Sequence, residues 1–346
     1  MGWFSIRPLL KRGRVFNIVI GGRGTGKTFN SIRELTEDNL NFIYMRRTFD
    51  ECTLIADHAD DMNFSPFQKI NNVTGKLEKM EIRTYEIKKS NKKIWNIYDG
   101  VGDLQHFVGA LCSLSTINSV RGFDADWCKA IVLDEFIPEK HVKKIGKGDS
   151  EGEAILNAYE TINRNRELEG EPPCLMFMFS NAFDISHPFL DILGLTPIIE
   201  RMKRKGTQFV DLPQKNLTIT LYEDKEFMEA KSKTALYQLT RGSSFYEMAL
   251  NNDFVYNDFS LVRSKNIAEY NPYVIFDGIE IYKHKSNGSY YCSLCLKQCN
   301  NIYHDVDNER TEFVIKYGRI LYAAFIKGNI FFENYAIKKK IMEVIA

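Results

Sequence analysis

One short segment fixes the local fold around it. Residues 21–28 have the sequence Gly-Gly-Arg-Gly-Thr-Gly-Lys-Thr and match the pattern G-x-x-x-x-G-K-[ST]. An apolar, β-branched run precedes them at residues 15–20, and apolar residues at helical spacing follow at residues 28–40. A strand, a glycine-rich turn and a helix N-terminus in this order surround a phosphate with backbone N–H groups. The segment therefore predicts a nucleotide site on a parallel α/β sheet.

The residues of this loop have separate expected roles. The glycines let the chain wrap a phosphate, Lys27 is expected to reach the outer phosphates, and the Thr28 hydroxyl is expected to bind Mg²⁺. The alternative is a glycine-rich turn with an incidental lysine. The predicted cofactor-binding residues are Gly21, Gly22, Arg23, Gly24, Thr25, Gly26, Lys27 and Thr28.

A second apolar run ends in two carboxylates. Residues 130–133 are Ala-Ile-Val-Leu, and Asp134 and Glu135 follow. Asp134 is expected to hold the metal ion, through water, and Glu135 to polarise the attacking water as a general base. An apolar run before Asp-Glu is common by itself, so a solvated strand end is the alternative. The loop upstream favours the catalytic interpretation.

The acid pair narrows the class of reaction. A metal ligand beside a base serves attack by water, whereas a small-molecule kinase transfers the phosphoryl group to another acceptor. GTPases usually carry an Asn-Lys-x-Asp reader, and residues 91–94, the nearest match, lack the aspartate. We therefore predict an ATPase that uses ATP and Mg²⁺.

Two further segments offer polar groups near such a site. Ser180 and Asn181 follow an apolar run at residues 174–179, where they are expected to sense the γ-phosphate; a simple turn is the alternative. Arg164 and Arg166 follow a helical stretch and suit an arginine finger that reaches a neighbouring subunit. A charged helix end is the alternative there.

Length and periodicity indicate how the chain divides. Its 346 residues are enough for two domains of about 150 residues each. We place an ATPase domain at residues 1–205, a linker at 206–245, and a smaller α+β domain at 246–346. Residues 63–107 alternate between apolar and polar and are interpreted as an antiparallel insertion.

Charge and cysteine content bear on partners and compartment. The formal net charge is +1, so affinity for a polyanion must come from local basic clusters. Seven cysteines, several inside apolar runs, favour a reducing compartment. The start of the chain shows no signal peptide or lipid-anchor pattern, and no apolar run approaches the roughly 20 residues of a spanning helix. We expect a cytoplasmic protein with no membrane partner.

Several segments, in order, carry a resemblance to a known family. Together they resemble the DNA-packaging ATPase, or encapsidation protein, of phi29-type small tailed phages. The resemblance is dense in motifs up to residue 185 and thinner beyond it. The segments are the loop with Arg23 inside it, Arg46 and Arg47 after an apolar run, and residues 132–136, 163–166, 180–182 and 246–250.

The resemblance implies a fold and an assembly. The fold is a P-loop NTPase of the additional-strand catalytic-glutamate type, in which the strand ending at Ser180 lies between the loop strand and the Asp134 strand. The assembly is a homo-oligomeric ring, of five subunits, that docks on the portal of an empty procapsid in the host cytoplasm. It moves double-stranded DNA inward with ATP, and a structural RNA is left open as a further partner.

The resemblance also implies roles for individual residues. Glu135 is the catalytic base, and Thr28 and Asp134 bind the metal. Arg164 is the finger, with Arg166 as its rival. The two residues that end the additional strand, Ser180 and Asn181, sense hydrolysis.

The C-terminal domain of that family resembles a ribonuclease-H-like nuclease that has lost its catalytic acids and contacts nucleic acid or the portal. The nearby acids here are Asp258, Asp277 and Glu280, and their spacing does not match a two-metal cluster. We therefore expect no nuclease activity.

Three cysteines depart from the pattern. Cys292, Cys295 and Cys299, with His284 and His304 nearby, have a spacing that suits zinc. Thiols packed on a strand are the alternative.

A lysine-rich loop after the acid pair is the expected DNA contact. Lys143, Lys144 and Lys147 are expected to face the pore of a ring and bind backbone phosphates regardless of base sequence; a solvated loop is the alternative. Lysines at residues 88–93 are less well placed. Two other functions are weighed: a nucleotide-gated DNA-binding switch, and a nuclease-bearing terminase large subunit.

Overall fold

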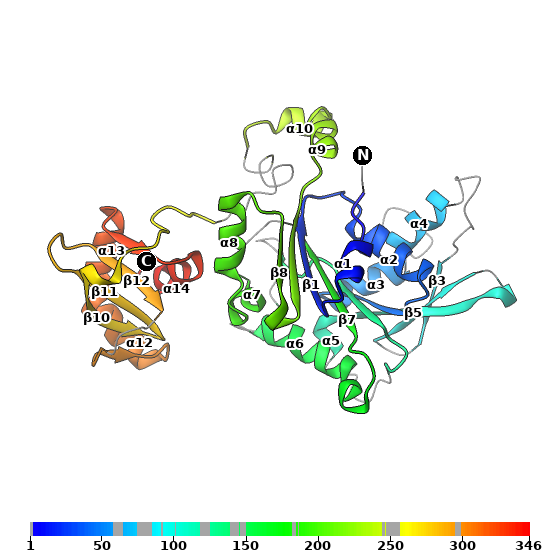
Figure 1. Ribbon diagram of the computed structural model, residues 1–346, viewed down its shortest axis with the longest axis horizontal. Helices are drawn as coiled ribbons and strands as arrows, with labels where there is room; N and C mark the ends of the chain where they lie inside the picture. Colours follow the sequence, from blue (N-terminus) through cyan, green and yellow to red (C-terminus); the bar gives the residue numbers. More distant parts are fainter. Residues whose placement is uncertain are drawn as a thin grey trace. The chain divides into compact units, whose positions relative to one another are not determined.

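The computed structural model describes most of the chain in two compact units (Figure 1). The described residues are 3–57, 65–74, 85–90, 93–100, 102–117, 125–138, 145, 150–181, 185, 187–243, 246, 257–294 and 299–346. One unit comprises Met1–Phe189 with Met202–Val255, and the other comprises Leu190–Arg201 with Tyr256–Ala346.

A nine-stranded sheet forms the centre of the described part of the first unit, in the order β3-β4-β5-β2-β6-β7-β1-β9-β8. The run from β5 to β9 is parallel throughout, and β3, β4 and β8 add antiparallel edges. The predicted, mostly parallel sheet is confirmed, and β7 lies between β1 and β6. The strands are β1 Phe16–Gly21, β2 Phe42–Arg46, β3 Tyr85–Lys89, β4 Trp95–Asp99, β5 His106–Ser113, β6 Ala130–Leu133, β7 Leu175–Ser180, β8 Phe209–Leu212 and β9 Leu217–Tyr222.

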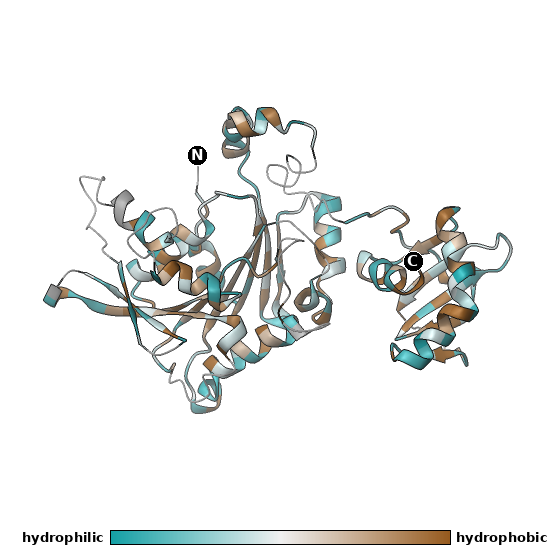
Figure 2. Cartoon of the chain, turned by 180° about the vertical axis from the view of Figure 1, so that it is seen from behind, coloured by the Kyte–Doolittle hydropathy of each residue, from teal (hydrophilic) through white to brown (hydrophobic). Residues whose placement is uncertain are grey.

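The central strands are buried on both faces because helices cover the sheet. All four residues of β6 are buried, as are five of the six in both β1 and β7. Such strands consist of continuous apolar residues rather than alternating ones, and they are brown in Figure 2. The sheet is therefore a rigid base for any group attached to its strand ends.

The helices of the chain up to residue 239 are short. Among the described residues, none is long and apolar enough to span a bilayer. They are α1 Arg7–Arg12, α2 Lys27–Glu37, α3 Phe49–Asp57, α4 Pro66–Thr74, α5 Leu114–Ile117, α6 Ser150–Asn163, α7 Pro188–Ile192, α8 Thr196–Lys205, α9 Lys225–Ser232 and α10 Ala235–Leu239.

Two regions differ from the sequence interpretation. The range expected to be a linker contains β8 and β9, which form the end of the large sheet, and β9 pairs with β1. The apolar residues of β9 alternate with threonines, so the sequence does not show the continuous apolar run of a buried strand. The expected antiparallel insertion holds the antiparallel pair β3 and β4, but also the helix α4.

The second unit is a smaller α+β body around a five-stranded sheet with the order β13-β10-β11-β12-β14. Asp277 and Gly278, both at positive φ, turn β10 into β11 as the Asp-Gly pair predicts. Helices cover one face over a core that includes Phe276, Phe313 and Phe332. The elements are β10 Tyr270–Phe276, β11 Ile279–His284, β12 Tyr290–Leu294, β13 Ile302–Tyr303, α12 Asp307–Phe313, a π-helical turn at Val314–Gly318, α13 Arg319–Ile326, β14 Ile330–Phe332 and α14 Tyr335–Ile345.

Candidate active site

The carboxyl ends of four parallel strands meet at one edge of the large sheet. In the strand registers, Ile20 of β1 pairs with Ser180 of β7, Leu133 of β6 pairs with Met178 of β7, and Met45 of β2 pairs with Leu133. Ligands of open α/β sheets bind in the crevice outside the carboxyl ends of the strands. The phosphate-loop residues, the acid pair and the end of the additional strand thus share one site.

The loop after β1 has the backbone that a phosphate site needs. Gly24 and Gly26 have φ values of 77° and 82°, which other residues rarely adopt. Gly26 begins α2 without a side-chain cap, so the first N–H groups of the helix remain available to an anion. Lys27 is buried, and its ammonium donates to the carbonyls of Gly21 (2.8 Å) and Gly22 (2.9 Å). Burial lowers the pKa of Lys27 to about 8.

The loop and the acidic strand end are joined by a single hydrogen bond. Thr28 Oγ1 donates to Asp134 Oδ2 at 2.7 Å, and Tyr44 Oη donates to the same oxygen at 3.0 Å. Asp134 is buried, with 6% of the residue exposed. A hydroxyl and a carboxylate oxygen in contact are ligands of the kind that Mg²⁺ prefers. The two halves of the predicted site are therefore in direct contact through a hydrogen bond.

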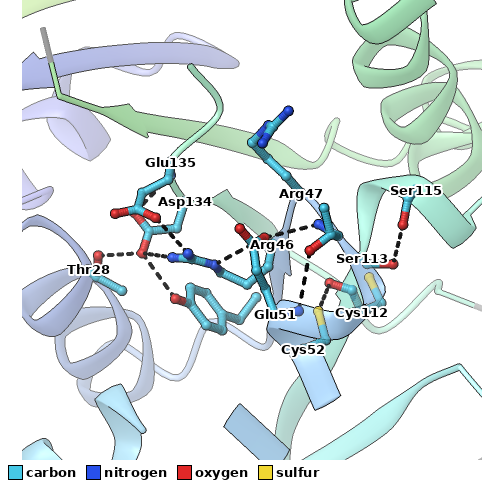
Figure 3. A network of polar contacts seen from close by, with 12 residues as sticks. Thr28, Arg46, Arg47, Glu51, Cys52, Cys112, Ser113, Ser115, Asp134 and Glu135 are labelled. Atoms are coloured by element: carbon cyan, nitrogen blue, oxygen red, sulfur yellow. Dashed lines mark hydrogen bonds and ion pairs between the residues drawn. The ribbon is translucent and has the colours of Figure 1, made fainter. Parts of the chain in front are cut away.

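Glu135 lies at the mouth of the site and pairs with an arginine (Figure 3). Its backbone is left-handed, with φ of 54°, and half of its side chain is exposed. Arg46, at the end of β2, donates from Nη2 to Glu135 Oε2 at 2.6 Å and from Nη1 to Asp134 Oδ2 at 3.2 Å. One guanidinium thus contacts two consecutive carboxylates and offsets part of their negative charge.

The remaining strand end completes a cleft of about 920 Å³. Ser180 and Asn181 line it together with the loop and the acid pair. Both residues are buried, and Ser180 Oγ donates to the carbonyl of Asn181 at 2.9 Å. The structure therefore places this pair on the same cleft as Lys27 and Asp134.

The two candidate finger arginines have opposite environments. Arg166 is buried and donates at 2.6 Å to the carbonyls of Cys128 and Ala125, so it holds a loop in place. Arg164 has a left-handed backbone, with φ of 45°, and its side chain is exposed at the end of α6. Its Nε donates to the carbonyl of Thr161 at 3.3 Å. Of the two, only Arg164 is placed to reach outward.

Comparison with known proteins identifies the family. The family model for the Podovirus DNA encapsidation protein (Gp16) matches residues 2–345 of the chain. The chain belongs to this family.

Two DNA packaging proteins of Bacillus phages are similar in sequence to most of this chain. The DNA packaging protein of Bacillus phage B103 is 30% identical over 265 residues, which cover 75% of this chain and 70% of that protein. The DNA packaging protein of Bacillus phage phi29 is 23% identical over 354 aligned positions, which cover 97% of this chain and 95% of that protein.

Solved structures share the fold. The bacteriophage phi29 genome packaging motor assembly aligns with a TM-score of 0.65 at 20% identity and covers 99% of both chains. The phi28 gp11 DNA packaging motor aligns with a TM-score of 0.58 at 19% identity, over 99% of this chain and 97% of that chain. The α/β architecture with a separate C-terminal domain is thus a property of the family.

Several predicted residues of this family member lie outside the described part of the chain. They include the three lysines of the expected DNA loop, Lys143, Lys144 and Lys147, and also Cys295 of the zinc pattern. Cys292 is described, and its thiol is buried in the core of the second unit, where burial raises its pKa. The burial of Cys292 agrees with thiols packed on a strand, and the zinc alternative stays untested.

Sequence reasoning gave no role to two groups that the family fold brings into the site. Arg46 was singled out only as part of the resemblance, and Tyr44 was not singled out. The available signal was position: β2 ends at Arg46, Arg47 follows it, and β2 lies beside β6 in a parallel sheet. The carboxyl end of β2 had to lie close to Asp134 and Glu135.

Proposed function

We propose that this chain is the ATPase of a phage DNA-packaging motor, which hydrolyses ATP to move double-stranded DNA into an empty procapsid. The observation that carries the proposal is the hydrogen bond between Thr28 and Asp134, which joins the phosphate loop to the acidic strand end. Membership of the encapsidation family, whose members from phages B103 and phi29 are DNA packaging proteins, supplies the DNA-moving function.

The loop is proposed to bind the β- and γ-phosphates of ATP. The Lys27 ammonium now donates to two loop carbonyls, so it is already held beside the space that the loop encloses. Phosphate oxygens are stronger acceptors for an ammonium group than neutral carbonyls. Phosphate binding would therefore redirect Lys27, and the added negative charge would favour its protonated form.

Thr28 and Asp134 are proposed to hold Mg²⁺. Their oxygens fit the ion because they are adjacent, hard and partly buried. When bound, the ion neutralises charge on the phosphates during phosphoryl transfer to water. Tyr44, which donates to Asp134 at 3.0 Å, orients that carboxylate.

Glu135 is proposed to accept the proton of the attacking water. Its half-exposed carboxylate lines the cleft, and Asp134 beside it is assigned to the metal ion. Arg46 occupies one oxygen of this carboxylate at 2.6 Å, so we propose that Glu135 separates from Arg46 before it accepts the proton. Ser180 and Asn181 are proposed to detect whether the γ-phosphate is present.

The assembly is proposed to be a homo-oligomeric ring of five subunits that docks on the portal. Exposed Arg164 supports this, because a finger at a helix end serves a neighbour's site rather than its own. We propose residues 1–205 together with strands β8 and β9 as the motor domain, the rest of residues 206–245 as a linker, and 246–346 as a ribonuclease-H-like domain without nuclease activity. That domain would contact nucleic acid or the portal, and a structural RNA remains a candidate partner.

DNA is proposed to contact Lys143, Lys144 and Lys147. These residues follow the acid pair closely in the chain, so a change at Glu135 can be transmitted to them. Contacts to backbone phosphates weaken steeply with salt and ignore base sequence.

Packaging into empty shells tests the proposed function. The purified chain, ATP, double-stranded DNA and empty procapsids are mixed at two salt concentrations, and DNA protected from added nuclease is measured along with ATP hydrolysis. We expect ATP-dependent protection that falls at high salt. A nucleotide-gated switch would bind DNA without protecting it, and a nuclease-bearing terminase would cleave plasmid in the presence of metal. Either outcome would contradict the proposal.

A further inference from the structure

An exposed tryptophan stands at the edge of the phosphate loop with no role in the chemistry described above. Trp3 lines the cleft together with the loop residues, and 54% of the residue is exposed. Large aromatic side chains bury most of their surface in folded proteins. An exposed indole in a nucleotide cleft therefore needs an explanation.

The position of Trp3 is built by the chain around it. Phe4 N donates to the carbonyl of Thr25 at 3.0 Å, and Asn30 Nδ2 donates to the carbonyl of Phe4 at 2.7 Å. Glu34, on α2, accepts from Ile6 N at 2.8 Å. These bonds tie the N-terminal segment to the loop and to α2, so Trp3 is held in place rather than carried on a loose end.

The loop leaves room for the indole. A Cβ atom at Gly26 would lie 2.5 Å from Trp3 Cε3, a distance at which atoms collide. Gly26 is therefore required for the ring as well as for its own backbone angle. On the other side, the ring lies at 59° to Phe29, with centroids 5.4 Å apart. One edge of Trp3 is thus supported while much of its surface stays open.

We propose that Trp3 is the platform on which the base of the bound nucleotide stacks. The inference rests on the proposed function, since it names a subsite of the same ATP site. Trp3 and Phe29 line the same cleft as residues 23–28, so a nucleotide whose phosphates were held by the loop could place its base against Trp3. Every base has a π-face that can stack on the indole. Purines have the larger face and stack more strongly than pyrimidines, so Trp3 favours purines and discriminates little between adenine and guanine.

Calorimetry with two ligands tests the assignment. ADP has a base and inorganic pyrophosphate has none, so only ADP contacts the platform. A stacked base is worth enough that Trp3→Ala is expected to weaken ADP binding about 5- to 100-fold. Pyrophosphate affinity is expected to change less than about twofold, and Trp3→Phe, which keeps an aromatic face, is expected to restore most of the ADP affinity.

Fluorescence supplies a second readout. The chain has three tryptophans, of which Trp95 is buried and Trp127 packs on Phe107. ADP is expected to change the emission of the wild-type chain and not that of Trp3→Phe, while pyrophosphate changes neither. Trp127→Phe, the matched control, is expected to keep the response to ADP.

Three results would overturn the proposal. Equal weakening of ADP and pyrophosphate by Trp3→Ala would show that Trp3 only supports the loop. Unchanged ADP affinity, with or without a change in oligomeric state, would exclude stacking. ADP and CDP bound equally tightly by the wild-type chain would exclude a base platform. A wild-type chain that binds neither ADP nor pyrophosphate would instead contradict the proposed function itself.

Discussion

At the residue scale, two adjacent arginines at the end of β2 have different tasks. Arg46 contacts both carboxylates of the acid pair at the edge of the cleft. Arg47 points into the protein and pairs with Glu151 at 2.6 Å, both side chains being 2% exposed. The alternation of side chains along a strand produces this division. One arginine therefore tunes the site and the other stabilises the fold.

Substituting each arginine by glutamine separates these tasks. Arg46→Gln leaves two carboxylates without their cation, and we expect a loss of about 1–3 kcal/mol in the free energy of unfolding of the nucleotide-free chain. Because Mg²⁺ restores the positive charge, addition of ATP and Mg²⁺ should raise the melting temperature of this variant more than that of the wild type.

Arg47→Gln is the matched control. It breaks a buried ion pair, with an expected loss of about 3–5 kcal/mol, and ATP with Mg²⁺ should raise its melting temperature no more than that of the wild type. Thermal unfolding followed by circular dichroism measures both variants. Equal nucleotide responses in the two would contradict the assignment.

At the scale of elements, α9 contacts the phosphate loop through Lys231. Asp224 caps the helix by accepting from Phe227 N at 2.9 Å, and the Lys231 ammonium donates to the carbonyl of Arg23 at 2.5 Å. Lys231 also lies 5.1 Å from the centre of the Tyr237 ring. Burial, and then Arg23, lower the pKa of Lys231. A helix of the region expected to be a linker is thus coupled to the nucleotide loop.

Removal of that contact should weaken nucleotide binding. Lys231→Ala deletes a half-buried, charged donor to the loop backbone, and we expect ADP affinity to fall about fivefold. The control Lys233→Ala removes an exposed lysine of the same region, which pairs with Glu229, and should change nothing. Titration calorimetry measures both. An unchanged affinity in Lys231→Ala would show that α9 does not support the loop.

The sequence pattern predicted strands whose residues are nearly all apolar and buried better than strands in which apolar and polar residues alternate. The buried strands β1, β6 and β7 have continuous apolar runs and were expected. β9 was missed because threonines alternate with its apolar residues. The partner of a buried threonine comes from another part of the chain, since Thr218 Oγ1 donates to Asn17 Oδ1 of β1 at 2.8 Å. The contact of Arg46 with the acid pair likewise depends on strand order, which local pattern does not contain.

At the scale of the whole molecule, a finger at Arg164 would mean that subunits complete one another's sites. The Arg164 side chain is exposed, whereas the buried Arg166 guanidinium donates to two backbone carbonyls. Sequence reasoning left these two as rivals, because burial and not residue type separates them. The family assignment could be made from ordered motifs, while the lysines expected to contact DNA stay predictions.

Mixing inactive subunits tests the trans arrangement. Arg164→Ala lacks the proposed finger but keeps the proposed base, and Glu135→Gln lacks the proposed base but keeps the proposed finger. A mixed ring contains interfaces with both intact groups, so ATP hydrolysis should partly return. Arg166→Ala should instead lower the melting temperature, since two buried carbonyls lose their donor. No rescue at any mixing ratio would contradict a finger acting between subunits.

The most direct measurement of the central claim compares nucleotide binding, ATP hydrolysis and DNA protection in the wild-type chain and in Glu135→Gln. Loss of a general base lowers the hydrolysis rate by about 10²–10⁴-fold. We predict that Glu135→Gln binds ATP as tightly as the wild type, hydrolyses it at no more than about a hundredth of the wild-type rate, and protects no DNA. Hydrolysis and packaging at wild-type rates would contradict the account.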